Sequence, residues 1–135
     1  MKEAAFSLSG YNFPQMSIDM SSLVGDKSLG LTIKPSGVFN TSEKTYTLKF
    51  EFKAFVEEVE CIRVLCVANF TFKGVNVVDD IPDFFYANSI AILFPYVRAF
   101  VSTMTLQANY KPIVLPTMNL SDLSQELKQN TIVEE

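Results

Sequence analysis

The run Ala91-Ile92-Leu93-Phe94-Pro95-Tyr96-Val97-Arg98 lies in the most apolar part of this 135-residue chain. Apolar residues recur there at helical spacing, and others, such as Phe84 and Phe100, cover further sides of the same cylinder. This pattern predicts a long helix over about residues 81–107 that buries more than one face. Because Pro95 has no backbone N–H, we expect it to kink or divide the helix.

A membrane-spanning helix is the rival interpretation of this run. Asn88, Pro95 and Arg98 interrupt it, however. The uncharged stretch between Asp83 and Arg98 is also shorter than the ~20 residues that a bilayer needs. The sequence therefore favours a helix packed within a protein, not one embedded in a membrane.

Acidic residues and a proline mark the start of the helix. Asp79 or Asp80 is placed as its N-cap, and Pro82 in the first turn loses nothing by its missing N–H. Asp79, Asp80 and Asp83 form the tightest carboxylate group, which could also hold a metal ion or do acid–base work. Each acid near a helix N-terminus contributes about 0.3–1 kcal/mol. We therefore favour capping and keep a metal-dependent enzyme as a rival.

Two long strands precede the helix. Apolar and polar residues alternate over residues 45–56 and again over 62–73, and the acidic stretch 57–60 joins them. Alternation with a period of two is typical of half-buried antiparallel strands, so these residues predict a β-hairpin. Shorter alternating pieces, broken by glycine and proline, precede it. We expect strands over about residues 5–73.

An apolar loop and a short helix follow. Pro112 and Pro116 favour an extended segment over residues 110–118. Leucines at helical spacing then predict a C-terminal helix over about residues 120–129. The length fits one domain, residues 1–135, on the usual scale of about 100–200 residues per domain.

Composition argues against most catalysis. The chain has no histidine, which removes the usual general base and the commonest transition-metal ligand. No glycine-rich phosphate loop is present, and no motif supplies a base to activate a serine nucleophile. We expect a binding protein that is not an enzyme, with no catalytic residue, no metal and no cofactor.

Charge and cysteine content point to partners and location. The net charge is −4, and the eleven Lys and Arg residues are scattered, which argues against a nucleic-acid partner. The N-terminus lacks the basic and apolar regions of a secretory signal, so we expect a cytoplasmic protein. Cys61 and Cys66 have neither metal-site nor redox spacing and are predicted to be small buried hydrophobes.

The apolar surplus predicts a partner. A small domain covers only part of its apolar area, and a helix that is apolar on several sides must bury a second face elsewhere. Self-association would do this. The apolar loop also offers a patch for polypeptide.

Several runs together resemble the SecB export-chaperone family: residues 91–98, then Val101-Ser102-Thr103-Met104, then Leu115-Pro116-Thr117-Met118-Asn119-Leu120 and Leu123. That family carries an Ile-Leu-Phe-Pro-Tyr-Ala-Arg stretch in its long helix and an apolar loop before a second helix. The resemblance runs without gaps over residues 92–123. It implies an α+β fold with a four-stranded antiparallel sheet, a long kinked helix on one face and a short C-terminal helix.

The resemblance also implies a function. SecB-like proteins are ATP-independent holdases that keep unfolded polypeptides and preproteins soluble for protein transport and folding, and they assemble as homotetramers, dimers of dimers. The client-binding groove is expected at Leu29, Leu31, Ile33, Tyr96, Ile113, Leu115 and Leu123. The oligomer interface is expected at Leu93, Val97, Val101 and Met104.

One departure concerns the export motor SecA. Export members of the family carry a glutamate on the outward face of the third strand, where SecA docks, and this sequence has Arg63 there. A reversed charge argues against SecA docking. The alternative is a SecB-fold interaction protein dedicated to one partner, such as an antitoxin, without SecA-linked export.

Overall fold

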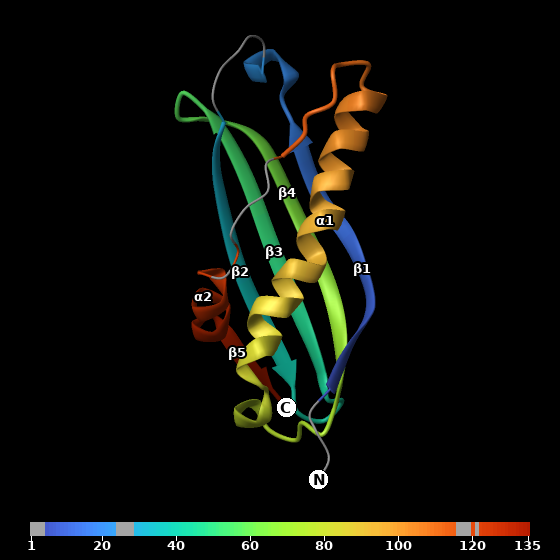
Figure 1. Cartoon of the computed structure of the whole chain (residues 1–135), viewed down its shortest axis with the longest axis vertical. Helices are drawn as coiled ribbons and strands as arrows, with labels where there is room; N and C mark the ends of the chain where they lie inside the picture. The colour runs from blue at the N-terminus through green and yellow to red at the C-terminus, as the bar shows by residue number, and fades with distance from the viewer. Residues whose placement is uncertain (1–4, 24–28, 116–119, 121) are drawn as a thin grey trace.

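The computed structural model of the chain describes residues 5–23, 29–115, 120 and 122–135 (Figure 1). In these residues, nine elements follow one another: β1 (Ala5–Ile18), the 3₁₀ helix η1 (Met20–Leu23), β2 (Gly30–Asn40), β3 (Thr45–Val56), β4 (Val59–Lys73), the 3₁₀ helix η2 (Val78–Asp80), α1 (Asp83–Gln107), α2 (Leu123–Gln129) and β5 (Thr131–Glu134). The expected α+β class is confirmed. Residues 116–118 of the predicted loop lie outside the described residues.

The described sheet has five strands in the order β1-β4-β3-β2-β5, not the four that were predicted. The first four are antiparallel to their neighbours. β5 adds a parallel strand to β2, with Gly37 opposite Thr131 and Asn40 opposite Glu134. The prediction missed β5 because four residues in a polar tail show no alternation of their own. They gain order only by pairing with the β2 edge.

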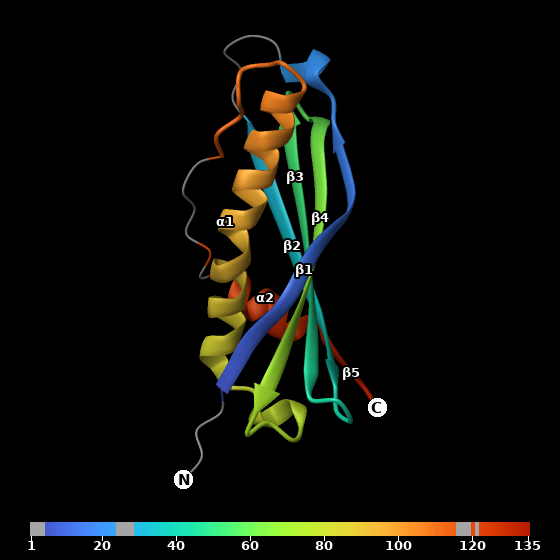
Figure 2. The ribbon, with the colours of Figure 1, turned by 90° about the vertical axis from the view of Figure 1, so that its right-hand side faces the viewer.

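The core lies between α1 and one face of the sheet (Figure 2). The alternation in β3 places Tyr46, Leu48, Phe50 and Phe52 on this face, all fully buried. Large apolar side chains contribute about 1.5–3 kcal/mol each when they are fully buried. The other face carries charged residues, so the predicted half-buried pattern of the hairpin is confirmed.

The N-cap of α1 lies two or three residues after the predicted acidic cap, Asp79 or Asp80. The N-cap is Pro82, and Asp80 instead accepts hydrogen bonds from the backbone N–H groups of Asn76 (3.0 Å) and Val77 (3.3 Å). The helix then runs from Asp83 to Gln107 without a break at Pro95. Proline does not divide it, since a single lost backbone hydrogen bond on an exposed turn leaves the buried stripe intact.

α1 is also long and apolar enough to cross a membrane, with a window of mean hydropathy 1.4. A helix buried in the core of a protein can be just as long and as apolar. Leu93, Val97 and Val101 are fully buried among the core residues of this chain. The helix therefore has a place within the domain that accounts for its apolar composition.

Candidate polypeptide-binding site

The apolar segment after α1 folds back along that helix. Arg98 Nε donates to Leu115 O (3.1 Å), and Ser102 Oγ donates to Ile113 O (2.7 Å). The N–H of Ile113 donates to Thr105 Oγ1 (2.9 Å). The three helix residues are spaced by four and three, so they lie on one side of α1. Figure 1 shows this segment between α1 and β2.

These hydrogen bonds pair main-chain N–H and C=O groups of the segment, which would cost free energy if they were unpaired in apolar surroundings. The side chains of the segment then divide by position. Leu115 is buried, with 1% of its surface exposed, whereas Val114 is 72% exposed. Ile113 is partly buried against the core. Neighbouring residues of one short segment therefore supply both an anchor and an open apolar surface.

The predicted groove residues on the β2 side fall into two groups. Ile33 and Leu115 belong to the core. The others are partly buried hydrophobics packed against it: Leu29, Leu31, Ile113 and Leu123. With Val114, these four make up what we call the β2-side rim.

The C-terminal segment is fixed to the same side of the sheet. α2 contacts β2, and the Tyr46 hydroxyl hydrogen-bonds with Thr131 Oγ1 (2.6 Å), which itself donates to Leu127 O (2.7 Å). Tyr46 reaches Thr131 beneath Gly37, where an added Cβ would overlap the tyrosine ring. Glycine is therefore required at this point of β2 for the tyrosine to hold β5.

Tyr96 does not join the other predicted groove residues. Its ring lies 4.4 Å from that of Tyr11 in β1, at the opposite end of the strand order from β2. Tyr96 and Arg98 are two residues apart, and two residues turn a helix by about 200°. Arg98 faces the folded-back segment, so Tyr96 faces the other side of α1.

The residues predicted for the oligomer interface lie mostly inside one chain. Leu93, Val97 and Val101 are fully buried, so they have no surface to offer to a second copy. Met104 is partly buried and lines a cavity of about 180 Å³ with Met16 and Met20. The helical spacing identified an apolar stripe correctly, but that stripe packs on the chain's own sheet.

A different apolar face remains exposed where β1 crosses α1. Aromatic rings pair across the two elements: Phe13 stacks on Phe100 with centroids 4.0 Å apart, and Tyr11 meets Tyr96. The partly or largely exposed members define what we call the β1–α1 face: Tyr11, Met16, Phe84, Ile92 and Tyr96. The sequence analysis noted the apolar residues Phe84 and Phe100 on further sides of the helix but did not connect them with β1. The signal for the face was apolar residues at multiples of four along α1, at 84, 92, 96 and 100, with alternating aromatics in β1.

Arg63 lies on β4, on the polar face of the sheet opposite α1. Its Nη2 is 3.8 Å from Glu51 Oε2, and Glu51 also pairs with Lys53 at 3.6 Å. The Arg63 side chain is 48% exposed, so its positive charge is available at this surface.

The two cysteines are buried, as predicted, and neither is in a disulfide. Burial raises the pKa of the Cys66 thiol to about 11 and shifts the pKa of Cys61 in the same direction. A thiol with a raised pKa is a poor nucleophile at neutral pH. These residues behave as core side chains.

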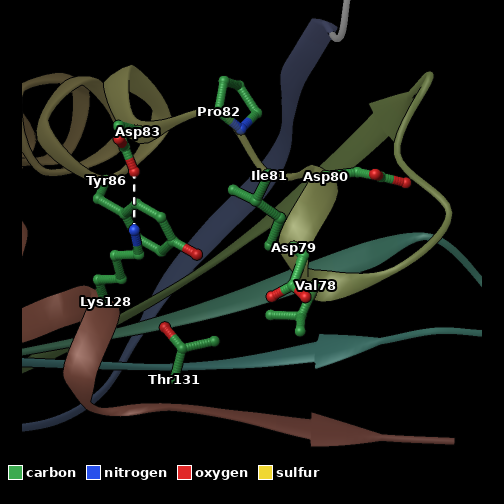
Figure 3. Close-up of a pocket in the computed structure, with 9 residues that line it drawn as sticks. All are labelled: Val78, Asp79, Asp80, Ile81, Pro82, Asp83, Tyr86, Lys128 and Thr131. Atoms are coloured by element: carbon green, nitrogen blue, oxygen red, sulfur yellow. Dashed lines mark hydrogen bonds and ion pairs between the residues drawn. The ribbon is translucent and has the colours of Figure 1, made fainter.

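The acidic residues at the start of α1 line a cavity of about 530 Å³ (Figure 3). Asp83 Oδ1 accepts from Lys128 Nζ at 2.9 Å, and Asp80 is occupied by backbone N–H groups. Within the described residues, no three His, Cys, Asp or Glu side chains are grouped closely enough to hold a metal ion. Asp79, Asp80 and Asp83 therefore do not form the ligand set that the rival hypothesis, a metal-dependent enzyme, needs.

Comparison with known families agrees with the fold. A family model described as preprotein translocase subunit SecB matches residues 31–131, which is 101 of the 135 residues. The chain therefore belongs to the SecB family. The resemblance drawn from the Phe-Pro-Tyr run of α1 is confirmed.

Individual relatives are more distant. The SecB-like chaperone Rv1957 of Mycobacterium tuberculosis, solved with a ChAD peptide from the HigA1 antitoxin, aligns with a TM-score of 0.63 at 9% identity. The alignment covers 84% of this chain and 91% of that one, and it shows a shared fold. An uncharacterized protein of Methanocaldococcus jannaschii, MJ0357, is 42% identical over 52 residues. That match spans 38% of this chain and about a third (34%) of the relative.

Proposed function

We propose that this protein is an ATP-independent holdase that covers the apolar segments of non-native polypeptides in the cytoplasm. The observation that carries the proposal is the β2-side rim, in which Ile113 and Val114 belong to a segment whose backbone is fixed to α1 by Arg98, Ser102 and Thr105. The main chain of that segment does not need to change shape to present its side chains.

The chemistry of the rim suits clients of many sequences. Each partly exposed Leu or Ile offers a shallow contact, worth about 1 kcal/mol if half of the side chain becomes buried. Several such contacts must be made at once for useful affinity, and none selects a particular side chain strongly. Folded proteins have buried their own apolar segments and would be ignored. Preproteins awaiting export are one class of client that this surface suits.

Self-association is proposed through the β1–α1 face. β1 ends the described sheet, and the exposed aromatic residues beside it need cover. A second copy can pair the free edge of β1 and bury Tyr11 and Tyr96 together. Two such dimers joined through the exposed stripe of α1 would give the expected homotetramer.

A dedicated interaction protein is the alternative. The structural relative Rv1957 holds a peptide from an antitoxin, which supports a single partner of this kind. Arg63 on the polar face of the sheet carries the charge opposite to that of the export members, which supports a duty without SecA docking.

Suppression of aggregation tests the proposal. Wild-type protein should keep several unrelated, chemically unfolded proteins soluble, and Leu31→Asp should weaken this at least about tenfold. Thr32→Asp is the matched control, because Thr32 is the next residue of β2 and is exposed. Leu115 is unsuitable for such a variant because a buried carboxylate would destabilise the core.

Two results would contradict the proposal, one its site and the other its activity. Equal weakening by the two variants would show that the client site is not at the rim. The other is a wild-type protein that protects none of the unrelated clients, which would favour the dedicated partner.

A further inference from the structure

The sheet has a second face, which points away from α1 and carries no helix of the described chain (Figure 2). Neighbouring side chains on one face of a sheet are about 5–8 Å apart. Lys34 lies directly opposite Glu51, and Lys53 lies opposite Arg63. Four basic side chains on three adjacent strands therefore form one group, which we call the outer-face patch: Lys34 of β2, Lys49 and Lys53 of β3, and Arg63 of β4.

The outer-face patch differs in sign from the rest of the molecule. Two carboxylates pair with it: Glu51 lies 3.6 Å from Lys53 and 3.8 Å from Arg63, and Glu60 lies 3.6 Å from Lys53. Four positive and two negative charges leave a local net charge of +2, in a chain whose net charge is −4. A local potential opposite to that of the whole chain selects partners by charge and orients them as they approach.

Two of the four basic groups are free to meet a partner. Lys34 and Lys49 are exposed, and neither forms an ion pair with another residue of the part that the structure describes. They line one shallow cavity of about 370 Å³, together with the Ser36 hydroxyl and Leu65. Ammonium and hydroxyl groups both donate hydrogen bonds to carboxylates.

Apolar side chains lie among these charges. Leu65 and Val67 of β4 are partly exposed on the same face, and Val67 lies directly opposite Lys49. A phosphate backbone offers nothing to such side chains, and a patch of +2 releases few counterions from it. A polypeptide that carries both acidic and apolar residues matches both features of the surface.

We infer that the outer-face patch docks an acidic segment of a partner polypeptide, whose carboxylates contact Lys34, Lys49 and Arg63 and whose apolar side chains contact Leu65. This surface is separate from the proposed client site. Leu31 of the β2-side rim and Lys34 are an odd number of residues apart in one strand, so they lie on opposite faces of the sheet. One molecule can therefore hold a client at the rim and the acidic partner on the outer face at the same time.

Titration with the peptide acetyl-Glu-Leu-Glu-Glu-Leu-Glu-amide, followed by NMR of the backbone amides, tests the patch. Either face of this peptide, when extended, carries two glutamates and one leucine. We expect saturable shifts at Lys34, Lys49 and Leu65 that become smaller at high salt. The peptide with glutamine in place of glutamate should bind at least about tenfold more weakly. Equal binding of the two peptides, or shifts confined to the β2-side rim, would overturn the inference.

Two variants should change the affinity for the acidic peptide in opposite directions. Lys49→Glu should weaken binding about fivefold, whereas Lys111→Glu, the same change at an exposed site after α1, should not. Glu51→Gln removes the carboxylate at the centre of the patch and should strengthen binding about threefold, whereas Glu126→Gln, on α2, should not. A gain in affinity cannot come from misfolding. Equal effects of Lys49→Glu and Lys111→Glu, or no gain in Glu51→Gln, would overturn the inference.

Two further measurements identify the partner and separate the patch from the holdase. A single-stranded oligonucleotide should not bind under the conditions in which the peptide does. Binding of the oligonucleotide that Lys49→Glu weakens would overturn the polypeptide partner. Lys49→Glu should also protect unfolded clients as well as the wild type does. A loss of that protection would make the patch part of the client site and overturn the separate docking surface, whereas loss of peptide binding alone leaves the holdase standing.

Discussion

The β1 edge and the β2 edge of the sheet differ in what covers them. β1 pairs with β4 over its length, and beyond it the described chain leaves the aromatic β1–α1 face open. The β2 edge is covered by the chain's own β5, which pairs with it, and by α2, and the Tyr46–Thr131 hydrogen bond holds β5 in place; the folded-back segment is tied to α1 by Arg98. An open edge of fixed shape suits a second copy. An edge covered by short tethered segments suits polypeptides of varied sequence.

The largest expected effect lies at the β2 edge. Gly37→Ala places a Cβ in the Tyr46 ring, so the tyrosine must move and release Thr131. We expect a loss of about 3 kcal/mol in the free energy of unfolding, measured with denaturant. Gly30→Ala, in the same strand, has only Phe55 O near its Cβ, at 3.9 Å, and should cost less than about 1 kcal/mol. Equal costs would show that Tyr46 does not fix the edge.

The next effect separates the two edges. Tyr96→Glu puts a charge into the β1–α1 face and should weaken self-association at least about tenfold, or 1.4 kcal/mol. Val133→Glu is the matched control, because Val133 is 49% exposed but lies on β5. Sedimentation over a range of concentrations measures both. If only Val133→Glu caused dissociation, the interface would have to lie at the β2 edge.

Tyr46→Phe removes only the hydrogen bond to Thr131, so it should cost about 1–1.5 kcal/mol at neutral pH.

Burial raises the pKa values of Tyr46, Tyr86 and Cys66, so the unfolded chain loses these protons at lower pH than the folded chain. Stability should therefore fall as the pH rises above about 9. Tyr46→Phe should make that fall shallower, whereas Tyr110→Phe, at an exposed site, should not. The free energy of unfolding, measured with denaturant from pH 7 to 11, checks this. A value that does not fall with pH would show that burial does not hinder the ionisation of these groups.

The smallest effect is local. Ser102→Ala removes the 2.7 Å hydrogen bond to Ile113 O and should cost about 0.5–1 kcal/mol. Amide exchange at Ile113 should become faster, because its N–H bonds to Thr105 in the same tether. Thr103→Ala, at the exposed next position, should change neither. Unchanged exchange in Ser102→Ala would mean that the segment is held by packing alone.

Local patterns predicted the hairpin and the long helix because alternation and helical spacing are properties of the segment itself. They did not predict β5, whose four residues become a strand only beside β2. They also did not say which neighbour an apolar stripe meets. Leu93, Val97 and Val101 were expected between chains and pack on the chain's own sheet, while Tyr96, next to them in sequence, faces β1. Burial and partner depend on contacts between segments that are distant in the sequence.

Light scattering coupled to size exclusion, with and without a chemically unfolded client, tests the division between the two edges most directly. The account predicts that wild-type protein elutes as an oligomer and carries the unfolded client but not its native form. Leu31→Asp should keep the oligomer and lose the client, whereas Tyr96→Glu should lose the oligomer and still bind client. A Leu31→Asp variant that carries client as well as wild type, or a wild-type monomer that ignores it, would contradict the account.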